Sequence, residues 1–527
     1  MLGLLGICGV DAAGGPVMGD IPASLRFRGA QDLSLTLSGA PTTWTIFVAV
    51  KRAALGEVQV LASSRLGGVY SADFGFDASD QLRLELYNGY YMTTTGKYFR
   101  DPTNWLLITL NVTDGGAINC YVADQLVGTG TAPASLSYIF NSSATNKLGV
   151  FGDLGVAFFK GYMARFCYVA GSALSYTSFI EYDATANEWK SKDKATIKAV
   201  VDAGGADSRM YDWQDGTSLA TLGYDYSAKG NNATLNNFSL TAGSTYDWML
   251  DVPGNSFATM NPIAPVCPTL SNGNLKITDG QLFGIATQQL RTGKWYAEMY
   301  VVTGGTASTC GVAKNASPST AYDYVGSTTD SYGYNGNNGN KYNNGSAVAY
   351  GASYTSGDVV GMLFDADAGT LEFTKNGVSQ GVAFTGLTGG SYFFAAEGRA
   401  NEVHMLFGQA PLHASATYDS ASGGYFRYTP PSGYKALCQA NMAEGTITTS
   451  GSFTGTAAAD GPVVNINGVP TAMTINGNAV TWGTHADALS NGFKIRTASA
   501  SYNNSGSNTF SVTSTGPKAK YALARGN

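Results

Sequence analysis

The segments with the clearest strand pattern lie between Gly293 and Gly408, namely Gly-Lys-Trp-Tyr-Ala-Glu (293–298), Gly-Val-Ala (311–313), Gly-Asp-Val-Val-Gly-Met-Leu-Phe-Asp (357–365), Gly-Thr-Leu-Glu-Phe-Thr-Lys-Asn-Gly (369–377) and Leu-Phe-Gly (406–408). Apolar residues at 295, 297, 299 and 301 alternate with their neighbours, which predicts a strand with one buried face. The apolar run 359–364 predicts a short strand covered on both sides. Asn376-Gly377 offers the two positive-φ positions of a tight hairpin turn.

Together these segments resemble a SPRY (B30.2-type) β-sandwich, to which we assign residues 263–408. The resemblance implies a domain that binds through surface loops and carries no catalytic machinery. Asp365 and Asp367 stand where a strand meets a turn, so we interpret them as caps of backbone N–H groups rather than metal ligands. We therefore expect recognition rather than enzyme activity.

The composition of this 527-residue chain predicts an all-β protein with several domains. Gly and Asn punctuate short runs of Val, Ile, Phe, Tyr and Thr, as in tandem β-sandwiches joined by irregular connectors. The formal net charge is −6, and only 13% of the residues are charged. Nucleic acid is therefore excluded as a partner, because phosphate neutralisation needs Lys and Arg stripes. A weakly charged surface rich in Tyr, Asn and Gly suits neutral glycans or other protein subunits.

The cysteines and the N-terminus indicate where the chain is assembled. The six cysteines stand singly, which argues against a disulfide framework and favours assembly in a reducing compartment. Residues 1–20 form an apolar attachment segment, whose first ten residues lack a basic start and are too short to cross a bilayer. No membrane insertion is expected. Two interpretations remain open for this segment, which docks either on a neighbouring subunit or on its own first domain.

Residues 21–180 show a second series of strand patterns. Thr43–Lys51 has an apolar face, 81–87 alternates, and further strands follow at 104–110 and 118–122. The Trp-Thr-Ile strand, the Asn-Trp strand and the closing Phe-Lys-Gly…Ala-Leu-Ser run of 159–175 resemble landmarks of the laminin-G/concanavalin-A-like jelly roll. The resemblance implies a jelly-roll sandwich over 21–180.

The remaining segments are assigned as connectors and one small domain. Residues 181–262 are interpreted as a connector with a short helix at Ala186–Val201, and residues 409–440 as a second connector. Residues 441–527 have hairpin-turn signals at Asn467-Gly468 and Asn476-Gly477, flanked by apolar residues. These signals predict a small C-terminal β-sandwich.

The order of these parts is similar to a family of tailed-bacteriophage virion proteins of the tail-fibre or host-attachment type. That order is the jelly roll, Leu-Asn-Asn-Phe-Ser-Leu-Thr-Ala-Gly (235–243), the SPRY pattern and Tyr428–Cys438. The resemblance implies a virion location after assembly in the host cytoplasm, with other virion subunits and a host surface glycan or protein as partners. It also implies a homo-oligomer, most often a trimer. A capsid decoration or head-fibre protein is the alternative interpretation.

A glycan-degrading enzyme is the third, less favoured hypothesis. Concanavalin-A-like hydrolases need two carboxylates that flank a sugar, about 5–9 Å apart. Glu85, Glu298 and Glu372 each stand alone on their strands, so we interpret them as solvent-facing. The three histidines lack metal-ligand spacing, and no phosphate-binding loop occurs. We therefore expect no catalytic residue, metal or cofactor.

One tyrosine-rich segment is the candidate contact surface. Tyrosine combines a flat apolar ring with a hydroxyl at low entropic cost, and binding loops favour it together with Asn and Gly. The alternative is that half of these tyrosines belong to the domain core. The candidate ligand-binding residues are Tyr322, Tyr324, Tyr332, Tyr334, Asn337, Asn338, Tyr342 and Asn343.

Overall fold

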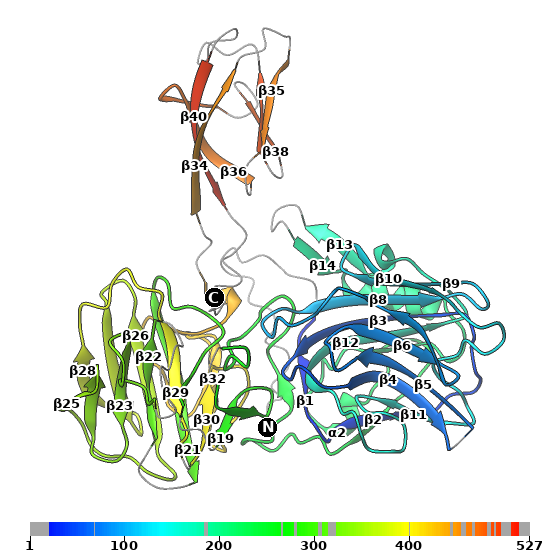
Figure 1. The fold of residues 1–527 in the computed structure, drawn as a ribbon, viewed down its shortest axis with the longest axis horizontal. Helices are drawn as coiled ribbons and strands as arrows, with labels where there is room; N and C mark the ends of the chain where they lie inside the picture. The colour runs from blue at the N-terminus through cyan, green and yellow to red at the C-terminus, as the bar shows by residue number, and fades with distance from the viewer. Residues whose placement is uncertain are drawn as a thin grey trace, which may run out of the picture. The chain divides into compact units, whose positions relative to one another are not determined.

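The computed structural model confirms an almost all-β chain (Figure 1). It describes residues 21–67, 69–183, 188–264, 267–278, 282–303, 308–314, 323–399, 401–442, 446–454, 460–465, 469–481, 486–489, 492–496 and 507–515. The N-terminal attachment segment 1–20 and Tyr322 lie outside these residues. The chain divides into two compact units, one holding the chain up to Ile180 with Ser191–Asn441, the other Glu181–Lys190 and the segment from Met442.

The first sandwich of the larger unit consists of two facing antiparallel sheets. One sheet has the order β10-β9-β8-β3-β12-β1-β17, with β15 also paired to β12. Its strands are β1 (Ser24–Arg28), β3 (Trp44–Arg52), β8 (Leu106–Val112), β9 (Ala117–Val122), β10 (Gln125–Thr131), β12 (Lys160–Ala170), β15 (Arg209–Tyr211) and β17 (Trp248–Met249).

The second sheet of this sandwich has the order β16-β2-β11-β4-β5-β6-β7. Its strands are β2 (Asp32–Leu35), β4 (Gln59–Leu66), β5 (Tyr70–Phe76), β6 (Leu82–Leu86), β7 (Gly89–Thr93), β11 (Thr145–Leu148) and β16 (Thr234–Asn236). Alternate apolar residues of both sheets, such as Ile46, Phe74 and Leu84, form one buried core between them.

Much of the segment 181–262 belongs to this sandwich, so its description as a connector is incomplete. Its strands β15, β16 and β17 extend the two sheets, and helix α2 (Leu219–Leu222) packs beside β16. The predicted helix at Ala186–Val201 begins too early, because β14 (Glu188–Ser191) pairs with β13 (Ile180–Asp183) and helix α1 spans Lys194–Asp202. Asp193 sets this start, since its side chain accepts the N–H of Thr196.

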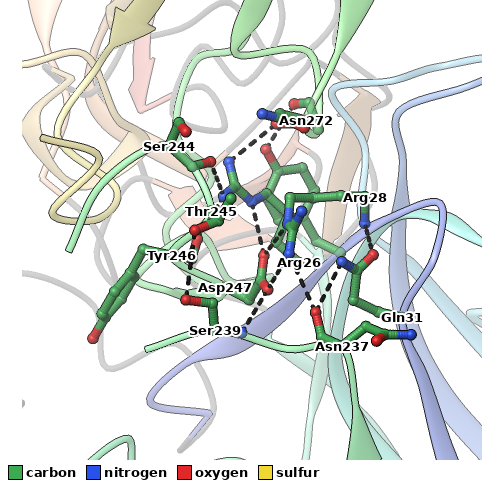
Figure 2. A network of polar contacts seen from close by, with 12 residues as sticks. Arg26, Arg28, Gln31, Asn237, Ser239, Ser244, Thr245, Tyr246, Asp247 and Asn272 are labelled. Atoms are coloured by element: carbon green, nitrogen blue, oxygen red, sulfur yellow. Dashed lines mark hydrogen bonds and ion pairs between the residues drawn. The ribbon is translucent and has the colours of Figure 1, made fainter. Parts of the chain in front are cut away.

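A buried ion network ties strand β1 to the segment that leads to the second sandwich (Figure 2). Asp247 is buried and accepts Nε of Arg26 at 3.4 Å and Nε of Arg28 at 2.8 Å. Arg26 also donates to the backbone oxygens of Ser244 and Tyr246, and at 3.2 Å to that of Asn272. Because Asn272 follows the first strand of the next sandwich, one arginine contacts both domains.

The outer face of β3 is also covered, although the sequence predicted only one apolar face. Lys51 is buried and its ammonium donates to Asp251 at 2.8 Å, Ser256 and the oxygen of Phe257. The indole N–H of Trp105 donates to the other carboxylate oxygen of Asp251. The chain beyond the first strands of this sandwich therefore returns to cover this sheet.

The second sandwich is built from two further sheets. One has the order β18-β19-β30-β21-β26-β27-β28, with β33 parallel to β21. Its strands are β18 (Thr269–Ser271), β19 (Lys276–Thr278), β21 (Lys294–Thr303), β26 (Val359–Asp365), β27 (Thr370–Lys375), β28 (Val378–Phe384), β30 (Glu402–Leu406) and β33 (Tyr434–Ala436).

The facing sheet has the order β20-β29-β22-β23-β24-β25. Its strands are β20 (Gly284–Ile285), β22 (Thr309–Ala313), β23 (Ser331–Asn335), β24 (Asn340–Asn343), β25 (Ser346–Ala349) and β29 (Phe393–Glu397). The Asn376-Gly377 turn is confirmed, since φ is 51° and 79° there and the turn joins β27 to β28.

The segment 409–440 covers this sandwich rather than merely leading away from it. It contains β31 (Thr417–Asp419), β32 (Gly424–Phe426), β33 and a short 3₁₀ turn, Gln439–Asn441. Phe426 packs edge-to-face on Tyr296 of β21, with ring centroids 4.9 Å apart. Strand β21 is therefore buried on both faces, and not on one face as its alternation predicted.

The described residues of the smaller unit form two short sheets, with the orders β34-β40-β36-β37 and β35-β39-β38. The strands are β34 (Thr446–Thr454), β35 (Asp460–Asn465), β36 (Val469–Ile475), β37 (Asn478–Ala479), β38 (Ala486–Leu489), β39 (Gly492–Arg496) and β40 (Ser507–Thr515). Positive φ at Asn476 and Gly477 confirms the second predicted hairpin turn. The turn at Asn467-Gly468 lies outside the described residues.

Replacing Asp247 tests the buried ion network. Asp247→Asn leaves two guanidinium groups without their carboxylate, so we expect the free energy of unfolding to fall by about 3–5 kcal/mol. Urea unfolding followed by tryptophan fluorescence measures this loss. The control is Asp153→Asn, which breaks the surface pair with Arg65 and should cost far less. Equal losses of unfolding free energy in the two variants would show that the buried network stabilises the fold no more than a surface ion pair does.

Candidate binding surface

The structure divides the predicted tyrosine-rich surface between two faces of one sheet. Tyr332 and Tyr334 lie on β23, and Tyr342 lies on β24, where it pairs with Gly333. Because neighbouring residues of a strand point to opposite faces, Tyr342 lies on the face opposite to Tyr332 and Tyr334. The sequence pattern placed them together, but the sheet separates them.

Tyr334 is a core residue, which corrects its prediction as a ligand-binding residue. Its side chain is 0% exposed. Its ring lies 5.0 Å from that of Tyr354, 5.3 Å from Tyr350 and 5.2 Å from Phe373, measured between centroids. The hydroxyl donates to the backbone oxygen of Ala352. This cluster fills the space between the two sheets of the sandwich, so no partner can reach Tyr334.

Tyr332 also faces the sandwich interior. Its ring is half-buried and lies 5.3 Å from Phe384 and 6.1 Å from Tyr392, both in edge-to-face geometry. Asn343 is a structural residue, because its amide nitrogen donates to the backbone oxygens of Thr329 and Ser331. These contacts hold the loop before β23 in place.

The residues that remain accessible form what we call the outer patch, consisting of Tyr324, Asn337, Asn338 and Tyr342. The rings of Tyr324 and Tyr342 pack edge-to-face at 5.5 Å, and the Asn338 amide donates to the Tyr342 hydroxyl at 2.9 Å. Asn337 and Asn338 are exposed. The patch thus combines two partly exposed rings with two amides, which suits contact with a polar partner.

Gly326 allows the loop before β23 to approach Tyr342 of β24 closely. Its φ is 103°, and a Cβ at this position would lie 2.6 Å from the Tyr342 Cβ and backbone oxygen. Only glycine tolerates both the backbone conformation and the contact. The loop can therefore bring Tyr324 against Tyr342.

Glu298 is buried, which corrects its prediction as a solvent-facing residue. Its carboxylate accepts the backbone N–H groups of Arg427 and Tyr428 at 2.8 and 2.9 Å, and the Tyr296 hydroxyl at 2.9 Å. Burial raises the pKa of Glu298 to about 7, although these hydrogen bonds act in the opposite direction. This acid fastens the 424–428 segment onto β21.

Glu397 is a second buried acid of the same sandwich. It accepts the hydroxyl of Thr309 on the neighbouring strand at 2.9 Å. Burial raises its pKa to about 7. Both acids have structural partners, and neither faces another carboxylate across an open space in the described parts of the sandwich.

Glu85 stands alone on its own strand, as predicted, but it has an acidic neighbour on the next strand of the sheet. It lies directly opposite Asp73 on β5, and Arg83 donates to Asp73 at 3.0 Å. Burial, repulsion by Glu85 and a hydrogen bond with it raise the pKa of Asp73 to about 7 against the attraction of Arg83. Carboxyl groups that hydrogen-bond to each other leave no room for a sugar between them, whereas a glycosidase pair needs about 5–9.5 Å.

The described residues contain no group of three or more His, Cys, Asp and Glu side chains that could hold a metal ion. Five cysteines within the described ranges are free thiols. No described helix has the length and apolar character required to span a bilayer.

Comparison with known proteins identifies the second sandwich. Residues 294–410 match the SPRY domain family. The chain is 40% identical over 95 residues to the E3 ubiquitin-protein ligase RKP of Arabidopsis thaliana, covering 18% of this chain and 7% of that protein. It is 32% identical over 122 residues to a Ran-binding proteins 9/10 homolog of Drosophila melanogaster, covering 23% and 13%. It is 39% identical over 103 residues to the dual specificity protein kinase splA of Dictyostelium discoideum, covering 19% and 4%.

Solved SPRY structures are similar to about a quarter of the chain. The SPRY domain of human HERC1 is 22% identical and covers 28% of this chain and 96% of its own, with a TM-score of 0.24. The TRIM65 PSpry domain is 18% identical and covers 28% and 89%, also with a TM-score of 0.24.

The chain therefore contains a SPRY domain, a protein-interaction module rather than a catalytic one. The matched part of this chain covers only between 4% and 13% of the length of the three curated relatives named above. The ligase and kinase names thus describe proteins that this chain matches only in part.

Two tyrosine variants test the division of the sheet faces. Tyr334→Ala opens a cavity among three aromatic rings, so we expect it to lower the free energy of unfolding by about 3–5 kcal/mol. Tyr342→Ala removes one edge-to-face ring contact at the surface and should cost about 1 kcal/mol. Thermal unfolding of the two variants measures the difference. Equal losses would contradict the assignment of the two residues to opposite faces.

Glu298 and Glu397, the two buried acids of the second sandwich, predict an unusual pH dependence of stability. Each has a pKa of about 7 in the fold and about 4.5 when unfolded, so between these values the folded chain binds more protons. Stability should therefore fall as pH rises from about 4.5 to 7, by up to about 1.4 kcal/mol per pH unit for each acid.

Urea unfolding at pH 5, 6, 7 and 8 measures this slope. Glu298→Gln cannot ionise and should flatten the slope, whereas the control Glu372→Gln, at a partly exposed position, should leave it unchanged. A wild-type stability that rises over this range, with no effect of Glu298→Gln, would contradict the prediction.

Proposed function

We propose that this chain is a tailed-bacteriophage virion protein, of the tail-fibre or appendage type, which attaches to the host surface by non-catalytic binding. The observation that carries this proposal is the outer patch of Tyr324, Asn337, Asn338 and Tyr342 on the SPRY domain. Partly exposed rings with amide groups favour a host glycan or surface protein as the ligand.

The construction of the larger unit supports a binding role. Asn343 holds the loop before β23 in place, and Gly326 lets this loop lie against Tyr342. A surface held by such contacts loses little conformational entropy when it binds. The unit therefore presents a preorganised patch to a partner.

The order of the segments along the chain, which resembles that of phage virion proteins, supports the virion part of the proposal. We propose that the chain is assembled in the host cytoplasm, joins other virion subunits as a homo-oligomer and is exposed on the particle. The buried, hydrogen-bonded acids Asp73, Glu298 and Glu397 support binding over glycan cleavage.

Variants of the outer patch test the proposal. We expect Tyr342→Ala with Asn338→Ala to reduce binding of the labelled protein to bacterial cells by about tenfold, a loss of about 1.4 kcal/mol. The control Val378→Ser changes an exposed apolar side chain of the same sandwich and should leave binding unchanged. Equal binding by patch and control variants would overturn the role of the patch.

Two further measurements address the alternatives. Immunogold labelling of phage particles with an antibody against this chain should mark the tail; labelling of the head would favour a capsid decoration protein. Release of reducing ends from the host polysaccharide by the purified protein would contradict non-catalytic binding.

A further inference from the structure

A polar row crosses the outer face of the sheet that contains β5 and β6. Residues paired in neighbouring antiparallel strands point to the same face, so the pairings place these side chains side by side. The inner residues of the same strands, such as Phe74 and Leu84, lie in the core. The row runs through Ser34, Lys147, Ser63, Asp73, Glu85 and Tyr90.

The end of this row, near the sheet edge, combines an exposed aromatic ring with fixed polar groups. Tyr90 on β7 is 65% exposed. Arg83 lies over its ring at 5.1 Å and donates to its hydroxyl at 2.8 Å. Another nitrogen of Arg83 donates to Asp73, so the guanidinium is held between the buried acid and the ring. Arg83 thereby fixes the orientation of the Tyr90 ring, while most of the side chain remains exposed to solvent.

Glu85 adds a hydrogen-bonding group directly beside the ring. It is partly exposed, lies opposite Tyr90 in the sheet, and accepts the Ser71 hydroxyl at 2.5 Å. The backbone N–H of Ser71 donates to the side-chain oxygen of Asn88 at 2.6 Å, which places an amide at the same edge. These contacts place the flat ring of Tyr90, the carboxylate of Glu85 and the amide of Asn88 in fixed positions at one edge of the sheet.

Two buried polar atoms, one of Asp73 and one of Arg83, have incomplete hydrogen bonding. Arg83 Nε is buried and has no hydrogen-bond partner among the described residues, and the buried Asp73 Oδ2 has none apart from the neighbouring Glu85 carboxyl group. An unpaired buried polar atom costs about 1–3 kcal/mol. Because both atoms are covered by the protein, they take no part in binding a ligand at the surface, which can contact only the exposed groups of the site.

The charges of Arg83, Asp73 and Glu85 indicate which chemical class of ligand the site can bind. One guanidinium lies beside two carboxyl groups, and burial raises the pKa of Asp73 to about 7, so these three groups carry little net charge together while Asp73 is protonated. Strongly charged ligands gain little there. A pyranose has an apolar C–H face that packs on the electron-rich face of a tyrosine, and hydroxyl groups that both donate and accept hydrogen bonds.

We propose that Tyr90, Arg83, Glu85 and Asn88 form a second binding site, on the first sandwich, which takes a neutral sugar residue of a polysaccharide. The sugar ring packs on Tyr90, and its hydroxyl groups bond to Glu85, Arg83 and Asn88. The site is separate from the outer patch of the SPRY domain and does not depend on it.

Titration with neutral oligosaccharides tests this site. The probes are maltohexaose, cellohexaose, mannohexaose and a galactan hexamer, added to the full chain and followed by isothermal titration calorimetry. We expect at least one to bind with a dissociation constant below about 1 mM, equivalent to about −4 kcal/mol. Absence of binding by all four at 1 mM and above would overturn the proposal.

Matched variants identify the residues responsible. Tyr90→Ala and Glu85→Gln should each weaken binding by about tenfold or more, whereas the control Tyr224→Ala, at an exposed tyrosine elsewhere in the same unit, should not. Unchanged affinity in Tyr90→Ala with unchanged thermal unfolding would also overturn the proposal.

The outer-patch variant separates this site from the proposed function. Tyr342→Ala should keep full oligosaccharide affinity while it loses cell binding. A chain that binds cells through the outer patch but binds no oligosaccharide would refute only the sugar site. Sugar binding without any binding to cells would refute only host attachment.

Discussion

The larger unit depends on a buried charge network centred on Asp247. Two arginines of β1 share this carboxylate, and Arg26 continues to backbone oxygens on both sides of the domain junction. Buried charges are tolerated only when their hydrogen bonds are nearly complete, so the network restricts the path of the chain between the sandwiches. The segment between the first sandwich and the SPRY domain is therefore structural, because its buried contacts join strand β1 to the chain that leads into the SPRY domain.

The same principle explains the other buried ionisable groups. Lys51 and Asp251 seal β3, and Glu298 holds the 424–428 segment over β21. In each case a later part of the chain returns to cover the outer face of an earlier strand. Ordinary sandwiches expose that face to water, whereas here it carries polar groups that find partners within the fold. The acids are therefore occupied in holding the structure together.

This arrangement separates residues that maintain the fold from residues available to a partner. Tyr334 and its aromatic neighbours lie between the sheets, whereas Tyr342 of β24 and Tyr324 of the loop before β23 lie on the outside of that sheet. On the first sandwich the exposed ring of Tyr90 stands above a fixed arginine. Both surfaces consist of aromatic rings with neighbouring amide or carboxyl groups, which agrees with the low charge of the chain and with recognition of a polar, weakly charged partner.

The amino-acid pattern was sufficient to predict the β class and the hairpin turns at Asn376-Gly377 and Asn476-Gly477, because alternation and positive-φ residues act locally, whereas the SPRY domain was predicted from its resemblance to a known family. It could not show which outer strand faces are covered, because the covering residue Phe426 lies far along the chain from Tyr296. For the same reason it placed Glu298 in solvent, treated Glu85 as solitary and grouped Tyr334 with Tyr342. Strand pairing and long-range packing, which depend on contacts between distant segments, decided the face and burial of each of these side chains.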